Sequence, residues 1–214
     1  TFPDMTSEDL GSREVIKSAK FLHYQPAETN TSIREGWFYR DDVHQKVRSA
    51  DDVFDIYERA VGGNSIFLLN IPPNRAGKFS PADVNVLKET GARIRETYSI
   101  DLLQEAKGPR EVLDGNTDTY ITLQQDGKME ILLSCPRPVT FNRLVIQEAI
   151  AQRGERVEKH AVDAWIDGNW QQIAGAANIG YKRILRFPEV TTDRIRIRIL
   201  ESRLSPSVCN ISAH

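Results

Sequence analysis

The hydrophobic pattern of this 214-residue chain changes near residue 103, and this change constrains the fold more than any other feature. Before that point, apolar residues follow helical spacing or form short continuous runs. Beyond it, apolar and polar residues alternate, most clearly in "RIRIRIL" at 194–200. Spacings of three and four indicate helices, whereas strict alternation indicates strands with one face in water. The sequence therefore predicts two structural units of different class.

The first hundred residues predict strands that alternate with helices. Residues 49–61 predict an amphipathic helix that ends at Gly62, and residues 80–98 predict a second one. The apolar run "SIFLLNI" at 65–71 lies between them and predicts a strand buried on both faces, and "KFLHYQP" at 20–26 predicts an earlier strand. This alternation is typical of parallel α/β architecture.

The remaining residues predict an antiparallel β-sandwich. Their alternating segments are joined by turn signals such as Asp167-Gly168, and no long helical stretch interrupts them. A length of about 110 residues is common for such sandwiches. We therefore expect an α/β plus all-β chain, with one unit at 1–104 and the other at 105–214.

Composition restricts the partners. The chain carries 28 Lys and Arg against 30 Asp and Glu, so a formal net charge of −2 gives no attraction to nucleic acid. Its apolar runs are too short to cross a bilayer, so we expect no membrane span.

We predict that Cys135 and Cys209 are buried free thiols, with a disulfide as the alternative. The chain starts at Thr1 without a methionine, and we expect it to be a piece of a longer protein.

The amino-terminal unit carries two long and specific motifs, "PAETNTSIREGWFY" at 26–39 and "GGNSIFLLNIPPNRAGKFSPADVNVLKETGARIRETY" at 62–98. Both resemble the α-L-fucosidases of glycoside hydrolase family 29. In the second unit, "EVLDGNTDTYITL" at 111–123 and "GERVEKHAVDAWIDGNWQQIA" at 154–174 resemble discoidin-type modules, the coagulation factor 5/8 C-terminal class. The resemblance implies the closing part of a (β/α)8-like barrel followed by a jelly-roll, discoidin-like sandwich.

The predicted barrel is incomplete. A full barrel needs eight strand–helix units in about 250 residues, and the sequence predicts two units. The rest of the barrel is therefore a predicted partner, in another chain or a missing segment. The resemblance implies retaining hydrolysis of terminal α-L-fucose from fucosylated oligosaccharides or glycoconjugates, without a catalytic cofactor. It also implies a bacterial source and a periplasmic or secreted location.

Glu28 is the candidate catalytic residue. Retaining hydrolysis needs two carboxyl groups, and no segment here resembles the motif of the family's nucleophilic aspartate, so we expect that residue outside the chain. Glu28 follows the predicted strand at 20–26, and barrel active sites gather beyond such strand ends. In many family members a glutamate at this place is the acid/base, but this chain is similar to a second subfamily whose acid/base glutamate lies upstream. Glu28 is thus acid/base, a supporting pocket residue or a solvated carboxylate.

Four further residues are candidates for substrate binding. Arg34 is one, and also a candidate partner of Glu28, where a cation would hold the carboxylate ionised and oppose proton donation. Trp37 is predicted to be the exposed member of an aromatic run whose other two residues lie in the core, and its ring would stack on a sugar. Asn74 and Arg75 follow the second strand, where they would reach an oligosaccharide or only shape a turn.

The loop "DGNTDT" of the sandwich is a candidate cation site. Its oxygen-bearing residues are Asp114, Asn116, Asp118 and Thr119. Closely spaced oxygens suit a hard cation, and the resemblance implies a structural calcium here, with a plain Asp-Gly turn as the alternative. Asn210 stands where the resemblance implies a glutamate, which weakens the site.

Two other functions compete with the enzyme. The chain could be a non-catalytic carbohydrate-binding module whose first hundred residues are scaffold. Alternatively, the sandwich is a brace docked on the barrel. The linker "LLQEAKGPRE" at 102–111 is short and poor in Gly and Ser, which favours a docked brace over a freely moving lectin.

Overall fold

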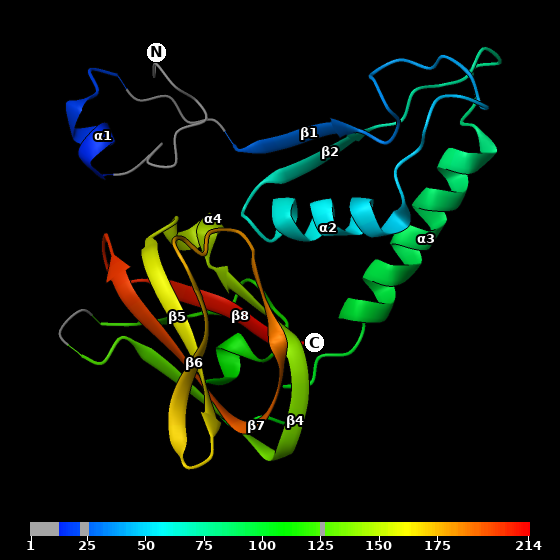
Figure 1. Cartoon of the computed structure of the whole chain (residues 1–214). Coiled ribbons are helices and arrows are strands. Elements are labelled where there is room, and N and C mark those ends of the chain that lie inside the picture. The colour runs from blue at the N-terminus through cyan, green and yellow to red at the C-terminus, as the bar shows by residue number, and fades with distance from the viewer. Residues whose placement is uncertain (1–12, 22–25, 125–126) are drawn as a thin grey trace.

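The computed structural model of the chain describes residues 13–21, 26–124 and 127–214. The α/β part consists of α1 (Arg13–Ser18), β1 (Glu28–Ser32), α2 (Ala50–Val61), β2 (Ile66–Asn70) and α3 (Pro81–Tyr98). The β part consists of the 3-10 turn η1 (Arg110–Val112), β3 (Ile121–Thr122), β4 (Glu130–Glu148), α4 (Ile150–Arg153), β5 (Val157–Ile166), β6 (Asn169–Ala176), β7 (Arg183–Ser202) and β8 (Ser207–Ala213). The two parts pack against each other, with α2 facing the sheet part (Figure 1).

Strands β1 and β2 pair in parallel and are joined by α2, as the alternating pattern predicted. Helix α2 begins behind Ser49, whose hydroxyl accepts a hydrogen bond from the amide of Asp52 at 3.1 Å. It ends at Gly62, and α3 opens with Pro81 in its first turn. Both predicted helices and the parallel α/β arrangement are confirmed.

One prediction about the strands of the α/β part is not tested, and another is wrong. The strand predicted at 20–26 includes residues 22–25, which lie outside the described part of the chain, and the first described strand lies at 28–32. Strand β2 is not buried on both faces, because Ile66 and Leu68 are 54% and 48% exposed. A two-stranded sheet with α2 on one side leaves its opposite face open, and alternate side chains point there.

The β part is one six-stranded sheet with the order β3-β8-β4-β7-β5-β6, in which all pairs are antiparallel. The long strands β4 and β7 shift register near Ser134, and the sheet closes around a core of Ile, Val and Leu. Ile195, Ile197 and Ile199 are buried in this core while the intervening arginines lie on the outer face. The predicted antiparallel sandwich is confirmed.

Buried charge also appears on the outer face of this sheet. Asp163 of β5 accepts hydrogen bonds from Arg196 and Arg198 of β7, at 2.8 and 2.7 Å from their Nε atoms. Burial opposes ionisation of Asp163, but these hydrogen bonds outweigh it and lower its pKa. The arginines of the alternating run therefore serve as partners of a carboxylate as well as a solvated face.

Both cysteines are free thiols, as predicted, but the prediction that both are buried is wrong for Cys135. Cys209 is buried, whereas Cys135 is only partly buried, and burial raises the pKa of each thiol.

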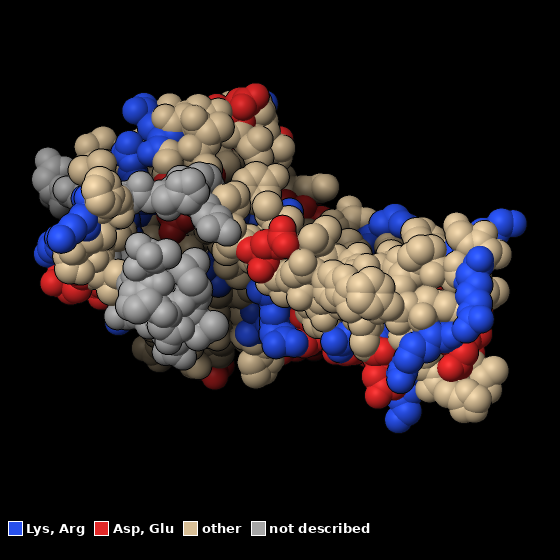
Figure 2. All heavy atoms as spheres, turned by 90° about the horizontal axis from the view of Figure 1, so that it is seen from above, with Lys and Arg blue, Asp and Glu red and all other residues tan. Residues whose placement is uncertain are grey.

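Within the described residues, no helix has the length and apolar character needed to cross a membrane. On the face seen from above, basic and acidic side chains are interspersed (Figure 2).

Glu58 of α2 joins the two parts. Its side chain is almost fully buried and accepts hydrogen bonds from Arg143 of β4, Arg186 of β7 and Tyr98 of α3. The tyrosine hydroxyl lies 2.6 Å from Oε1 and the Arg186 Nη1 3.3 Å from Oε2. Burial opposes ionisation of Glu58, but hydrogen bonds from Arg143 and Tyr98 outweigh it and lower its pKa. One carboxylate thus ties both helices to the sandwich.

A second contact connects the turn after α2 with the start of β7. The Ile184 amide donates to the Gly62 carbonyl at 3.0 Å, and the Tyr181 amide donates to the Asn64 Oδ1 at 2.7 Å. A Cβ added at Gly62 would lie 2.5 Å from the Ile184 Cβ, so the close approach requires glycine. At the carboxyl terminus, the Leu102 amide donates to the Ala213 carbonyl at 2.9 Å. The junction is therefore made of specific hydrogen bonds at several points.

Replacement of Glu58 by alanine should lower the free energy of unfolding by about 3 kcal/mol, because it leaves two arginines facing each other without their shared carboxylate. Denaturant unfolding of the chain measures this loss. Glu89→Ala, on the exposed side of α3, is the matched control and should change stability by less than about 0.5 kcal/mol. Equal effects of the two substitutions would show that Glu58 does not hold the parts together.

Candidate functional site

The carboxyl ends of β1 and β2 form the candidate site. Because the strands are parallel, Ser32 and Asn70 lie side by side at one edge of the sheet. The loops that follow them, 33–48 and 71–80, extend beyond this edge (Figure 1). In (β/α)8 barrels this end of the strands carries the active site. We therefore call this edge the rim.

Glu28 does not lie at the rim. It is the first residue of β1 and is exposed, so it lies at the amino end of the strand. Four residue steps separate it from Ser32, which corresponds to roughly 13 Å along the strand. The expectation that Glu28 lies beyond a strand end is wrong, because Glu28 is the first residue of β1. Its position at the amino end of this strand does not support a catalytic role.

Arg34 does not pair with Glu28. Its buried guanidinium binds the buried carboxylate of Asp83, with the Nε 2.8 and 3.0 Å from the two oxygens. Its Nη1 donates to the Asp41 carbonyl at 3.0 Å, and its Nη2 donates to the Asp42 Oδ1 at 2.9 Å. Burial opposes the charge of Arg34, but its hydrogen bonds to these carboxylates outweigh burial and raise its pKa. Arg34 is an internal tie rather than a surface group offered to a ligand.

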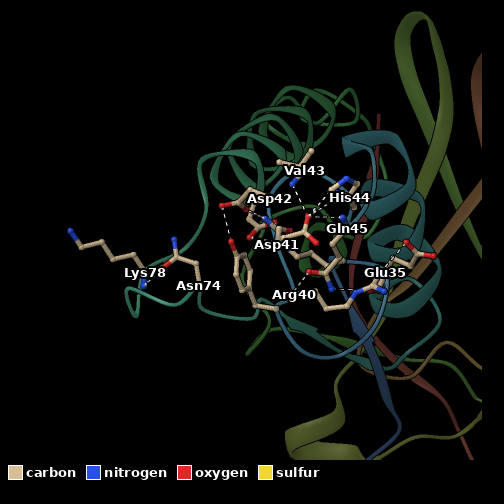
Figure 3. Close-up of polar contacts among 12 residues, drawn as sticks. Glu35, Arg40, Asp41, Asp42, Val43, His44, Gln45, Asn74 and Lys78 are labelled. Carbon is tan, nitrogen blue, oxygen red and sulfur yellow. Dashed lines mark hydrogen bonds and ion pairs between the residues drawn. The ribbon is translucent and has the colours of Figure 1, made fainter.

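The carboxylates around Arg34 accept hydrogen bonds within the middle of the loop 33–48 (Figure 3). Asp41 Oδ1 accepts hydrogen bonds from the amides of Val43 and His44, and these bonds lower the pKa of Asp41. The Tyr39 hydroxyl donates to the Asp42 Oδ2 at 3.0 Å, and the Arg34 guanidinium lies 5.3 Å from the Tyr39 ring centre. Partial burial and Asp42 raise the pKa of Tyr39. The loop is therefore held by charge-assisted contacts.

Trp37 is exposed as predicted, with 46% of its surface accessible, but it is not the only exposed aromatic of its run. Phe38 is 78% exposed, and Tyr39 is partly buried. The prediction that two of the three lie in the core is wrong. Alternation applies to strands, and these residues lie in an irregular loop. Two aromatic side chains thus project at the rim.

Asn74 and Arg75 take part in a turn of their own. The Asn74 Oδ1 accepts hydrogen bonds from the amides of Ala76 and Lys78 at 3.0 and 3.1 Å, so its side chain shapes the loop. Arg75 is exposed. In Figure 3, Asn74 and Lys78 lie apart from the cluster around Asp41 and Gln45. The turn alternative accounts for Asn74, while substrate binding by either residue stays a prediction.

Three residues at the rim escaped the sequence analysis. Asp83 carried only a weak signal, as an acidic residue in the first turn of a helix. Asn70 ends an apolar run and Gln45 lies in a polar loop, and neither pattern marks a site. Their partners lie in other segments, so no local spacing could reveal them.

The loop with the predicted cation site is closed by its own hydrogen bonds. The Asp114 carboxylate accepts from the Asn116 amide at 2.8 Å and from the Thr119 hydroxyl at 2.8 and 3.0 Å. These contacts lower the pKa of Asp114. The Asn116 Oδ1 accepts from the Asp118 amide at 3.1 Å. A cation would have to replace several of these donors, and the described residues contain no group of three His, Cys, Asp or Glu side chains that could hold a metal.

Replacement of Asp83 by asparagine should lower the free energy of unfolding by about 3 kcal/mol, because Arg34 stays charged and loses its fully buried partner. The measurement is denaturant unfolding at neutral pH. Asp51→Asn provides the control, since Asp51 also pairs with an arginine but is solvent-exposed, and its loss should change stability by less than about 1 kcal/mol. A small effect at Asp83 would show that the Arg34 pair is not needed for the loop.

Two family models match this sequence. The model described as F5/8 type C domain matches residues 96–212, which is more than half of the chain. The model described as Alpha-L-fucosidase matches residues 5–97. The two matches correspond to the sandwich and to the α/β part.

Related proteins agree with both matches. Alpha-L-fucosidase 1 of Arabidopsis thaliana is 30% identical over 201 residues, which cover 86% of this chain and 39% of that protein. The crystal structure of SpGH29 gives a TM-score of 0.82 at 33% identity and covers 88% of this chain and 44% of the other. A Ruminococcus gnavus GH29 fucosidase in complex with fucose gives 0.77 at 26% identity, with 87% and 41% covered. This chain spans about two fifths of the length of its curated relatives. It belongs to the F5/8 type C domain family through its sandwich, and its amino-terminal part is similar to the α-L-fucosidases of glycoside hydrolase family 29.

Proposed function

We propose that the chain is the closing part of an α-L-fucosidase that hydrolyses terminal α-L-fucose of fucosylated oligosaccharides or glycoconjugates with retention. The observation that carries the proposal is the parallel β1-α2-β2-α3 unit within the segment matched by the fucosidase model, with an aromatic loop at its rim. Exposed Trp37 and Phe38 offer apolar faces to the C–H groups and the methyl of a 6-deoxy sugar. Retention needs a nucleophile and an acid/base, and we propose that the nucleophilic aspartate comes from outside this chain.

The rest of the barrel is the proposed partner. Ile66 and Leu68 are exposed on the face of β2 opposite α2, and further strands of a closed barrel would cover them. Beside β1, a groove is lined by Thr29, Thr31 and Ile56. A preceding barrel helix would fill such a groove, since helices surround the strands of this fold. Both open surfaces support an assembly with further barrel segments.

We also propose the division into 1–104 and 105–214, with the sandwich as a brace. Glu58 and the Gly62–Asn64 turn tie the barrel segment to the sandwich, and Leu103 of the linker is buried in the sandwich core. A freely moving carbohydrate-binding module would not need these contacts. Glycan binding by 105–214 alone would support the lectin alternative, and a brace predicts none. A periplasmic or secreted location stays a prediction that rests on the family resemblance.

The catalytic roles can be tested in the enzyme assembled with its complete barrel. Because Glu28 lies at the amino end of β1, Glu28→Gln should change kcat on an aryl α-L-fucoside less than about threefold.

Trp37→Ala should raise KM about tenfold, because it removes a stacking surface worth roughly 1.4 kcal/mol. Steady-state kinetics measures both.

The opposite pattern would change the assignment. A drop of kcat by a hundredfold or more in Glu28→Gln, with fucose binding intact, would identify Glu28 as the acid/base despite its place in the strand. Absence of fucose release by the assembled wild-type enzyme would overturn the proposed function itself.

A structural calcium ion at the loop 114–119 stays a prediction. If it binds there, addition of calcium should raise the melting temperature and a chelator should lower it, because a ligand that binds only the folded state stabilises that state. Asp114→Ala should abolish the response, and Asp167→Ala, in an exposed turn of the sandwich, should leave it unchanged. A melting temperature that is insensitive to both calcium and chelator would leave the hydrogen-bonded turn as the whole role of the loop.

A further inference from the structure

The segment 33–48 is a long loop whose two ends are fastened together. The Glu35 amide donates to the Lys46 carbonyl at 2.9 Å, and the Arg48 amide donates to the Ile33 carbonyl at 2.8 Å. The segment contains no helix and no regular strand. Loops of more than about 12–15 residues without secondary structure are uncommon in compact domains and are usually functional or disordered. This loop has an internal network that holds it in one conformation.

Gln45 is the centre of that network (Figure 3). Its side chain is 4% exposed, and its Nε2 donates to the carbonyls of Glu35 and Phe38, both at 2.8 Å. Its Oε1 accepts from the Arg40 amide at 2.9 Å. Carbonyl oxygens accept and cannot donate, so the two carbonyls fix the orientation of the amide. Only a neutral amide of this length satisfies all three backbone groups.

Asn70 holds the neighbouring peptide from the other side. Its Nδ2 donates to the Trp37 carbonyl at 2.7 Å and to the Ser32 hydroxyl at 3.2 Å. The consecutive carbonyls of Trp37 and Phe38 are therefore each bound by a side-chain amide, one from the loop and one from the end of β2. Gly36, with φ of 90°, provides the left-handed turn that leads into this pair.

The backbone and the side chains of Trp37 and Phe38 have different environments. The peptide groups of Trp37 and Phe38 are anchored by amides, while their rings project into solvent. Folding alone gains little from exposed aromatic rings. Rigid aromatic side chains on a fixed backbone are instead typical of a preorganised recognition surface, because little conformational freedom is lost when a ligand binds.

We propose that Gln45 is a positioning residue that, together with Asn70, fixes Trp37 and Phe38 as a rigid aromatic edge of the sugar-binding pocket. The ligand class, a fucosylated saccharide, rests on the proposed function. The positioning itself does not. Gln45 touches no substrate, and it acts through the peptide groups that it holds.

The positioning is tested on the 214-residue chain with chymotrypsin, which cleaves after exposed aromatic residues in mobile backbone. Gln45→Ala and Asn70→Ala should each accelerate cleavage after residues 37–39 about tenfold, because local opening of the loop becomes easier. Gln171→Ala, on the exposed side of β6, is the matched control and should leave the rate unchanged. Cleavage after Tyr181, which is exposed on the sandwich, reports any general loss of stability.

Two results would overturn the proposal. One is an unchanged cleavage rate after residues 37–39 in both variants. The other is an equal increase after Tyr181, which would show general unfolding rather than a released loop. Should Gln45→Ala fail to fold, Asn70→Ala and Gln45→Glu carry the test, since a carboxylate cannot donate to the two carbonyls.

Kinetics of the assembled enzyme on a fucosylated saccharide extends the test to function. Gln45→Ala should raise KM at least fivefold and change kcat less than twofold, because the loop must be ordered when the ligand binds. An unchanged KM beside accelerated cleavage would show that the edge does not contact the ligand, and would overturn the pocket role. If the wild-type assembly is inactive while the cleavage result holds, the proposed function fails and the positioning stands.

Discussion

The packing of the two parts depends on one buried carboxylate that accepts hydrogen bonds from three separate segments of the chain. Glu58 of α2 accepts hydrogen bonds from Tyr98 of α3 and from Arg143 and Arg186 of the sandwich. A buried ion pair adds little stability in itself, but removal of one partner is strongly unfavourable. The contact therefore selects one arrangement of the two parts and excludes others. The rim loop 33–48 leads directly into α2, so the loop ends at the helix that Glu58 holds against the sandwich.

The same kind of contact, a buried carboxylate bound by arginine, occurs at the rim and on the sandwich. Asp83 holds Arg34 at the start of the loop 33–48, and Asp163 holds Arg196 and Arg198 across neighbouring strands. In each case the carboxylate is buried and its arginine partners come from another element. Arginine suits this role, because its planar fork can donate several hydrogen bonds while it stays charged. Charge in this chain thus specifies geometry more than it attracts ligands.

For function, this geometry separates the rim from the junction. The junction joins the turn after α2 to the sandwich, whereas the aromatic loop lies at the opposite end of the strands (Figure 1). A sandwich docked in this way can stabilise the α/β part without approaching the aromatic loop that we propose as an edge of the sugar pocket. The open face of β2 and the groove beside β1 are explained by the same view, since both would be covered by the barrel segments that the curated relatives' greater length allows.

The sequence by itself determined the elements whose pattern is local. Helical spacing with a Ser cap predicted α2, and strict alternation predicted the sandwich strands, because these patterns reflect contacts within one element and burial of one face. The motifs also identified the family. Only the tertiary structure decided where β1 begins, that Arg34 binds Asp83 rather than Glu28, and that Gln45 and Asn70 hold the aromatic loop. Arg34 and Asp83 are 49 residues apart, and β1 is a short and polar strand. Hydrogen bonds across such separations depend on how the elements pack, and no spacing in the sequence encodes them directly.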